Sequence, residues 1–426
     1  MVGDDFLNFD EEEEFSDLIS KCESAYEQGT LESMRFTEEE FEYLINYFID
    51  EMDDEIVYIL TGMGYNQHPY STEMTIRYAD VLIVNRDSDR ALGILNKQLS
   101  LDSGNSDIHF LLARVFIKKG DNQSAMEYIE SALTLTTNEG LDMLLTAAQD
   151  YIDLGSYENA IHMLERAESI APDNYELIND LAFCYERSDM LVKSLHYYEK
   201  YLDIDPFNDN VWFNIGTIYA REANIPKATE AFDYAIALNP DNSSVLYNKA
   251  ILLVNNGKYD EGIETFRSFL KIEPNNLFAL IGIADAYLAK DKLDDAITYF
   301  RMVLDIDSDN LDANTGTAYI NMLRHEQHEA LTCLRKVIGD DRTDFLFLIT
   351  ELLTSYKRTK NPEFLVYYLV SLYNTKESGL FNIYLEMLVA YDELWLARLF
   401  ELIPSLKRDD TVTKQINKIK KKSNLK

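Results

Sequence analysis

Three residue types are scarce in this chain of 426 residues: cysteine, glycine and proline. The three cysteines, Cys22, Cys184 and Cys333, are widely spaced. This excludes the disulfide framework of a small secreted protein and favours reduced thiols that pack as small apolar side chains. Sixteen glycines and eight prolines are too few for collagen, low-complexity linkers or a turn-rich all-β fold. The scarcity of these turn formers therefore favours a mainly helical chain.

Long apolar runs are also missing. No stretch approaches the roughly 18 to 20 apolar residues that span a bilayer. The first residues, MVGDDFLNFDEEEEF, are acidic where a signal peptide would be basic and then apolar, and Gly3 is not at the second position that myristoylation needs. Apolar residues nevertheless make up 46% of the chain, enough to bury a large core. We therefore expect a folded cytoplasmic protein without membrane insertion.

Positive charge is in short supply. The formal net charge is −36, which repels nucleic-acid phosphates and anionic membranes and argues against nucleic acid as a partner. The charge is uneven, because residues 1–60 carry a net −18 and residues 405–426 a net +6. Two interpretations stay open: the charged ends are simply solvated, or they attract each other between copies of the chain.

Motifs of catalysis are absent from the sequence. It contains no GxxxxGK[ST] loop, no GxGxxG after a strand, no GxSxG elbow and no HExxH, so nucleotide binding, α/β-hydrolase chemistry and zincin chemistry lack support. Residues 345–404 contain no recognisable reactive constellation. We predict a protein that is not an enzyme and that uses no cofactor.

Two patterns resemble metal sites and need weighing. Asp305-x-Asp307-x-Asp309 begins like a calcium loop, but Asn310 stands in place of the turn glycine and Gly316 in place of the bidentate glutamate. His325 and His328 are three residues apart without partner ligands, whereas a structural zinc site needs four. Both segments are expected to be turns between helices, and no metal is predicted.

What the sequence does contain is a repeat of 34 residues. The unit 209–242 defines it, the units 141–174, 175–208, 243–276 and 277–310 match in the same frame, and weaker copies start at residues 72, 106 and 311. With one inserted residue near Gly140, eight units span 72–344. Within 209–242 the defining residues are Trp212, Ile215, Gly216, Tyr219, Ala228, Phe232 and Pro240.

Each unit is typical of two short amphipathic helices joined by a tight turn. A small residue such as Gly216 lets the second helix approach the first, and an aromatic residue such as Tyr219 fills the space beside it. In the second helix Ala228 and Phe232 share one face, and a proline then ends the helix before the Asp-Asn cap of the next unit. Because no unit covers its apolar face alone, neighbouring units must stack into a solenoid.

The frame is lost at both ends. We expect an acidic helical N-terminal region over 1–71, with a degenerate repeat from the capping box Thr37-x-x-Glu40 onward, and the array over 72–344. Residues 345–404 are predicted to form an irregular helical cap and 405–426 a basic tail that ends in a helix.

The spacing W-x2-L-G-x2-Y, A-x3-F, P, with Ile215 for the leucine, resembles the tetratricopeptide repeat family. The resemblance implies an all-α superhelix of about eight repeats that serves as a protein-binding scaffold or adaptor. In this family the first helices line the concave face, and positions 2, 5, 6, 9, 12 and 13 of each repeat contact ligands. Carried onto this chain, the peptide-groove candidates are Arg114, Lys118, Phe183, Arg187, Phe213, Asn214, Arg221, Tyr247, Asn248, Ile251, Ile281 and Asp285.

Within this set the asparagines suggest a role. Asn214 and Asn248, flanked by Phe213 and Tyr247, are suited to hold the amides of an extended peptide while the rings pack its side chains. The arginines and lysine would make the inner face less negative and favour an acidic or mixed segment. Position 5 holds no lysine in any repeat, so the clamp that some family members use for a chaperone's C-terminal carboxylate is missing.

Two alternatives remain. These rows of residues simply solvate and fill the groove, or the chain is a self-assembling structural or regulatory protein, a homo-oligomer held by its acidic N-terminal region and basic tail. The favoured function is a non-catalytic scaffold that binds an extended protein segment.

Overall fold

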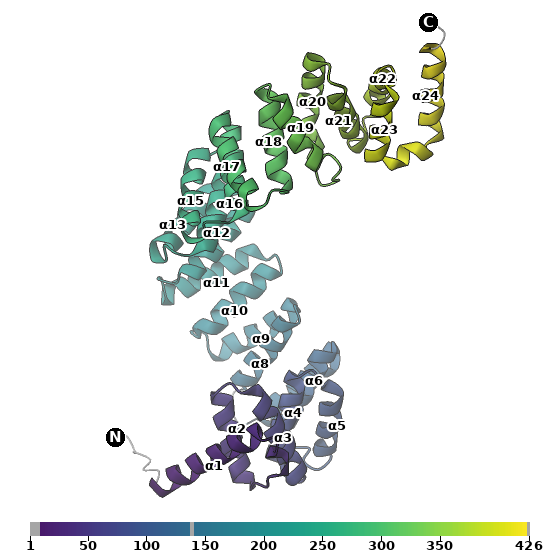
Figure 1. Cartoon of the computed structure of the whole chain (residues 1–426). Coiled ribbons are helices and arrows are strands. Elements are labelled where there is room, and N and C mark those ends of the chain that lie inside the picture. Colours follow the sequence, from purple (N-terminus) through teal and green to yellow (C-terminus); the bar gives the residue numbers. More distant parts are fainter. Residues whose placement is uncertain (1–8, 137–139, 424–426) are drawn as a thin grey trace. The chain divides into compact units, whose positions relative to one another are not determined.

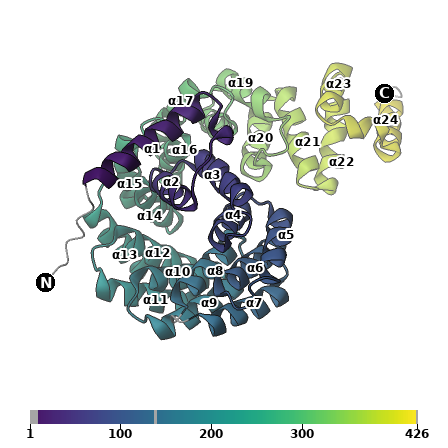
Figure 2. The same ribbon diagram turned by 90° about the horizontal axis from the view of Figure 1, so that it is seen from below.

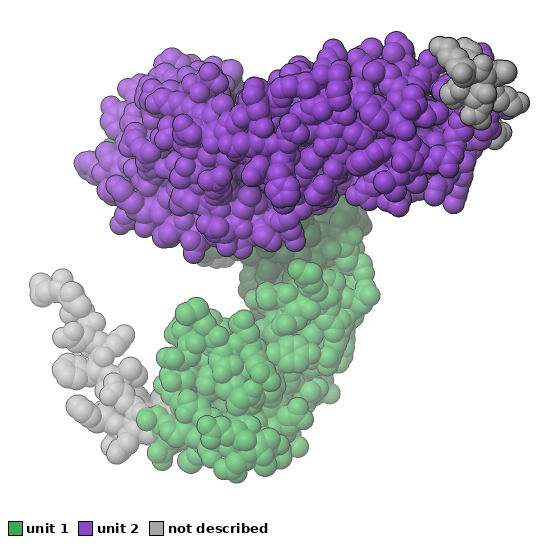
Figure 3. Space-filling model, turned by 45° about the horizontal axis from the view of Figure 1, so that its top comes forward, with its two compact units in different colours: residues 1–206 green, residues 207–426 purple. Residues whose placement is uncertain are grey.

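The computed structural model describes residues 9–136 and 140–423, and it divides into two compact units, Met1–Pro206 and Phe207–Lys426 (Figures 1 and 3). Three parts of the predictions lie outside the described residues: the first eight residues of the acidic region, the last three of the basic tail, and residues 137–139 beside the expected insertion near Gly140. Within the described ranges every regular element is a helix, which confirms the predicted all-α repeat fold.

The first unit begins with a long helix and continues as a series of helical hairpins (Figure 1). Its helices are α1 (Phe9–Glu27), the short 3₁₀ turn η1 (Leu31–Ser33), α2 (Glu38–Asp50), α3 (Asp54–Gln67), α4 (Thr72–Val84), α5 (Ser88–Leu99), α6 (Ser106–Lys119), α7 (Asn122–Leu135), α8 (Leu141–Asp153), α9 (Tyr157–Ile170), α10 (Tyr175–Arg187) and α11 (Leu191–Ile204). In Figure 2 the first helices α6, α8 and α10 follow one another on one side of this unit, and the second helices α7, α9 and α11 on the other.

The second unit repeats the same hairpin and ends in shorter helices. Its helices are α12 (Asp209–Arg221), α13 (Ile225–Leu238), α14 (Ser243–Asn255), α15 (Tyr259–Ile272), α16 (Leu277–Ala289), α17 (Leu293–Ile306), α18 (Leu311–Leu323), α19 (Gln327–Val337), α20 (Phe345–Thr359), α21 (Pro362–Asn374), α22 (Ser378–Val389), α23 (Glu393–Leu402), the 3₁₀ turn η2 (Pro404–Arg408) and α24 (Asp410–Ser423). Each first helix packs on its own second helix and on neighbouring repeats, so the contacts are local.

The turns inside the hairpins from α2–α3 to α20–α21 have the same backbone form. One residue after the first helix adopts a positive φ, the left-handed conformation that closes a helix C-terminus. It recurs every 34 residues, with one extra residue before Gly155 and before Lys360. Glycine occupies three of these positions and other residue types the rest: Met52, Arg86, Gly120, Gly155, Asp189, Ala223, Gly257, Asp291, His325 and Lys360.

Asparagine caps start the first helices of the second unit. The side chains of Asn208, Asn242, Asn276 and Asn310 each accept a hydrogen bond, of 3.1 to 3.3 Å, from the backbone N–H three residues on. These caps satisfy amide groups that a helix leaves unpaired at its start. The predicted Asp-Asn cap after Pro240 is confirmed at Asn242, as is the capping box of Thr37.

The predicted small-to-large packing is present inside the hairpins. A Cβ atom on Gly216 would come within 2.6 Å of the ring of Phe232, a side chain that is almost fully buried. Gly316 meets the ring of Phe300 in the neighbouring repeat in the same way. Close approach of the helices therefore depends on the missing side chain at these positions.

The C-terminal segments are helical as expected. Asn361 caps α21 and Pro362 stands in its first turn. The tail helix α24 buries Val412 and Ile416 on one face. The three cysteines are free, with Cys22 and Cys184 buried. The domain boundaries inferred from the sequence stay predictions.

Candidate functional site

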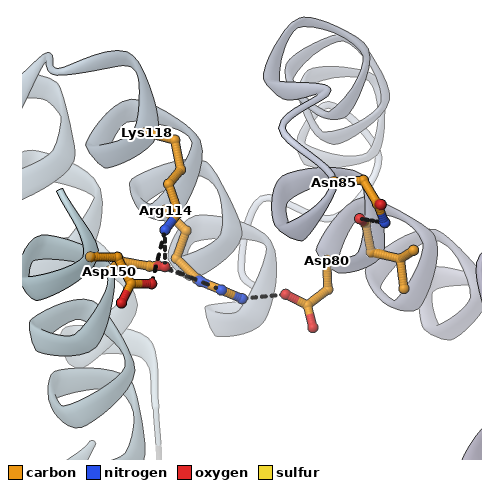
Figure 4. Close-up of polar contacts among 7 residues, drawn as sticks. Asp80, Asn85, Arg114, Lys118 and Asp150 are labelled. Carbon is orange, nitrogen blue, oxygen red and sulfur yellow. Dashed lines mark hydrogen bonds and ion pairs between the residues drawn. The ribbon is translucent and has the colours of Figure 1, made fainter. Parts of the chain in front are cut away.

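A row of charged side chains connects three successive first helices of the first unit (Figure 4). Arg114 on α6 lies between Asp80 on α4 and Asp150 on α8. Its Nε donates to Oδ2 of Asp150 at 2.7 Å, and its Nη1 pairs with Asp80. Lys118, one turn further along α6, places Nζ 2.7 Å from Oδ1 of Asp150. Lys118 also lies 3.7 Å from Oδ2 of Asp153, so two cations and three carboxylates form one network across three repeats.

This network is largely shielded from solvent. The side chains of Arg114 and Asp150 are only 11% and 6% exposed. Burial disfavours the charge of Arg114, but its hydrogen bond to Asp150 and the nearby negative charges outweigh that penalty and raise its pKa. The positive charges of Arg114 and Lys118 are therefore compensated within the fold. The expectation that the inner face is less negative than the outer one stays a prediction.

Phe183 and Arg187 on α10 form a cation–aromatic cluster with Tyr157 on α9. The guanidinium carbon of Arg187 lies 5.7 Å from the ring centre of Tyr157 and 5.9 Å from that of Phe183, and the two rings meet edge to face. Arg187 is exposed and also donates to the Tyr157 hydroxyl at 3.4 Å. Tyr157 was missed from sequence because it lies on a second helix.

The predicted aromatic residues of the second unit pack partly into its core. The half-buried ring of Phe213 lies 6.0 Å from that of Phe232, and Tyr247 lies 5.4 Å from Phe269. Asn248 is exposed, and its amide donates to the carbonyl of Ser244 one turn earlier at 2.8 Å.

The other predicted residues of α12 and α14 differ in exposure. Asn214 and Ile251 are half-buried, whereas Arg221 is exposed. Contact of these residues with a ligand stays a prediction.

A cavity of about 700 Å³ lies among α16, α18 and α20 of the second unit. Its lining includes two predicted groove residues, Ile281 and Asp285 on α16. Tyr319 on α18 and Phe347 on α20 form an aromatic wall, with ring centres 4.3 Å apart. Asp312, at the start of α18, also lines it.

Three of these lining residues were missed from the sequence. Asp312 and Tyr319 occupy positions 2 and 9 of the repeat that starts at residue 311, so the family's positional rule carried one repeat further identifies them. Phe347 lies beyond the last repeat, and no sequence signal marked it.

Asp285 has an unusual environment within this cavity. The residue is exposed overall, but the surrounding walls partly desolvate its carboxylate. This desolvation, helped by the negative charge of Asp312, raises the pKa of Asp285 to about 6.

A second hollow, of about 720 Å³, lies at Ile225, Tyr234 and Lys258 on the side of the second helices. None of the groove residues predicted from the sequence is among those described there. The cavity at Asp285 is therefore the stronger candidate site.

Two further properties of the described residues bear on function. No three His, Cys, Asp or Glu side chains in this part of the chain are grouped so as to hold a metal ion. None of the described helices is both long and apolar enough to cross a membrane. At the two metal-like patterns, Asn310 caps α18 and His325 is the left-handed turn residue before α19.

Comparison with solved structures found helical repeat proteins. A crystal structure of MamA is 22% identical, with a TM-score of 0.38, and the match covers 39% of this chain and 91% of that one. YrrB, described as a protein of this repeat type with an unusual peptide-binding site, is 24% identical over 44% of this chain and 97% of its own, with a TM-score of 0.34. A tetratricopeptide repeat protein from Parabacteroides merdae is 18% identical over 63% and 98%, with a TM-score of 0.39.

Comparison with family models gave direct matches to the repeats. Two models, both described as tetratricopeptide repeat, match residues 213–276 and 247–310 in the second unit and 106–139 and 141–174 in the first. The comparison with curated proteins found no match. The matched segments coincide with the hairpins whose caps, small residues and left-handed turns recur in one frame. Residues 106–174 and 213–310 are tetratricopeptide repeats.

Proposed function

We propose that this chain is a non-catalytic scaffold that binds an extended protein segment on the face lined by its first helices. Tetratricopeptide repeat proteins bind protein or peptide partners and are typically non-catalytic, which supports the general role. The observation that carries the finer proposal is the cavity among α16, α18 and α20. Ile281 and Asp285, chosen from sequence by their repeat positions, line the same hollow as the aromatic pair Tyr319 and Phe347.

The cavity has the features of a recognition site for a protein segment. Aromatic and aliphatic side chains give apolar contact area, and a few carboxylates fix the orientation of polar groups. Its volume of about 700 Å³ is large enough for more than one side chain. A repeat array adds further contact points along neighbouring first helices, which suits an extended partner better than a compact one.

The test is capture of partner proteins by the intact chain and by groove variants. The immobilised chain is exposed to an extract of its native cells, and bound proteins are identified by mass spectrometry. Asn214→Ala with Asn248→Ala, and separately Tyr319→Ala, should reduce capture of the partner several-fold without a large loss of helical circular dichroism. Binding is then measured directly by fluorescence anisotropy with a labelled segment of the captured protein.

A matched control removes two asparagines outside the proposed face. Asn256→Ala with Asn275→Ala changes residues in turns after first and second helices, and should leave capture unchanged. If the groove variants retain the same proteins as the control variant, with the affinity of the unaltered chain, the groove assignment is wrong.

Self-assembly through the charged ends is the alternative function. In the tail, Val412 and Ile416 are buried and Lys420 forms an ion pair with Glu393, 2.6 Å apart, so part of this helix is engaged within its own unit. Assembly by charge predicts oligomers at low salt that dissociate at high salt. Light scattering that gives a monomer at low salt would remove this alternative.

A further inference from the structure

The walls of the cavity at Asp285 carry an excess of negative charge. Asp285, Asp312 and Asp344 line it from α16, α18 and the cap of α20, and Asp291 lines it from the turn after α16. One cation, Arg342, is also in the lining.

The charge of Arg342 is already engaged outside the cavity lining. Its Nε and Nη2 donate to Asp340 at 3.0 and 2.6 Å. These hydrogen bonds lower the pKa of Asp340 to about 2, so the pair stays ionised and mutually neutralised at neutral pH. Arg342 also interacts electrostatically with Asp312, but its hydrogen bonds go to Asp340, so one partly engaged cation faces four aspartates in the lining.

A buried hydroxyl group adds an unsatisfied polar atom. Thr315 on α18 lines the cavity and is only 6% exposed, and its Oγ1 has no hydrogen-bond partner among the described residues. A buried polar atom without a partner is costly, so a donor group placed in the cavity would gain by pairing with it. A hydroxyl accepts a hydrogen bond from an N–H donor as readily as it donates one.

The apolar part of the lining matches the stem of a long side chain. Leu288, Tyr319 and Phe347 supply aliphatic and aromatic surface next to the carboxylates. Lysine and arginine pack their methylene stems on such surface and place the charged end among acids, and a guanidinium also stacks on aromatic rings. A metal ion fits less well, because no three ligating side chains are grouped there within the described residues.

We propose that this cavity is the recognition pocket for a basic side chain, arginine or lysine, of a bound protein segment. The proposal rests on the scaffold function above and specifies the chemistry of its ligand. Asp285 and Asp312 neutralise the cation, Tyr319 and Phe347 pack on its stem, and the Thr315 hydroxyl accepts one of its N–H groups. The raised pKa of Asp285 fits an acid that waits for a positive partner.

The test uses a defined probe with a neutral counterpart. N-acetyl-arginine amide and N-acetyl-citrulline amide have nearly the same shape, but only the first is charged. Ligand-observed saturation-transfer NMR with the full chain, at probe concentrations up to about 10 mM, should detect the arginine compound. Citrulline should bind at least about tenfold more weakly, because it leaves the carboxylates unpaired. The lysine analogue should bind as well.

Two double variants locate the site. Asp285→Asn with Asp312→Asn should abolish the arginine signal, whereas Asp241→Asn with Asp305→Asn, which removes two exposed acids outside the cavity, should leave it unchanged. Circular dichroism and thermal melting verify that both variants fold.

Three outcomes would overturn the proposal: no binding of arginine, equal binding of citrulline, or unchanged binding by the Asp285/Asp312 variant. The scaffold function fails separately. If the Asn214/Asn248 and Tyr319 variants lose the captured partner while Asp285→Asn with Asp312→Asn keeps it at full affinity, the groove is correct and the basic pocket is wrong.

Discussion

Replacing Arg114 by alanine tests whether the charged row of the first unit is structural. The substitution leaves Asp150, which is 6% exposed, with Lys118 as its remaining cation, while the half-exposed Asp80 returns to water. Removing one partner of a buried ion pair costs about 3 to 5 kcal/mol. Because Lys118 still lies 2.7 Å from Asp150, we expect about 2 to 3 kcal/mol for Arg114→Ala.

Arg166→Ala is the matched control. Arg166 bonds to Glu130 across two repeats of the same unit at 2.6 Å, but these side chains are 32% and 56% exposed. An exposed pair contributes less than about 1 kcal/mol, so this variant should be nearly neutral. A second variant, Arg114→Met with Asp150→Leu, removes both charges of this pair. It should recover part of the loss, because Lys118 keeps only Asp153, 3.7 Å away, as a partner.

Urea unfolding followed by circular dichroism measures the free energies. Because repeat arrays need not unfold in one step, hydrogen exchange of α6 and α8 is measured alongside. The expected result is faster exchange in these two helices for Arg114→Ala and little change for Arg166→Ala. If the two single variants are equally stable, the charged row does not stabilise the fold. If partner capture falls with Arg114→Ala while stability does not, Arg114 is a ligand contact instead.

Three further predictions concern single residues. Gly216→Val should lower the free energy of unfolding by about 2 kcal/mol, because the valine side chain collides with Phe232. Gly93→Ala, on an open helix face, should raise it by about 0.5 kcal/mol. Urea unfolding of both variants measures these changes, and an unchanged Gly216→Val would contradict the packing argument. Burial raises the pKa of Cys184 to about 12, so a thiol reagent should label it only after unfolding, and rapid native-state labelling would contradict this. Since the pKa of Asp285 rises from its usual 3.8 to about 6 on folding, the native chain binds more protons and stability falls as pH rises through this range. Asp285→Asn should therefore be more stable than the parent at pH 7.5 by up to about 1 kcal/mol, after allowance for solvent screening, and equally stable near pH 3. Equal stability at both pH values would show that folding does not raise the pKa of Asp285.

Much of the hairpin architecture could be predicted from local residue chemistry. Asparagine caps, the glycine against Phe232 and the proline after the second helix act over a few residues, so their spacing alone carries the signal. The partners of Arg114 could not be predicted in this way. The repeat frame places Asp80 and Asp150 on neighbouring first helices, but only the packed side chains reveal that both carboxylates converge on one guanidinium.

The candidate pocket was predicted in part. Ile281 and Asp285 followed from repeat positions, whereas Phe347 comes from a helix outside the recognised frame and meets Tyr319 only through the tertiary fold. The left-handed turns could not be recognised in the sequence for a different reason. At most of the left-handed positions the residue is Ala, Arg, Lys, Met, His or Asp, so the glycine that normally signals such a turn is missing.

These left-handed turns have a consequence for how the array responds to stress. A residue with a Cβ atom in this conformation costs about 1 kcal/mol relative to glycine. The hairpins closed by Gly120, Gly155 and Gly257 are free of that cost, while those closed by residues such as Ala223 and His325 carry it. Because each repeat is supported only by its neighbours, this difference sets an order of opening along the chain. Local unfolding of such an array is expected to begin at hairpins closed by residues with a Cβ atom. A single substitution of that residue by glycine should stabilise the hairpin concerned.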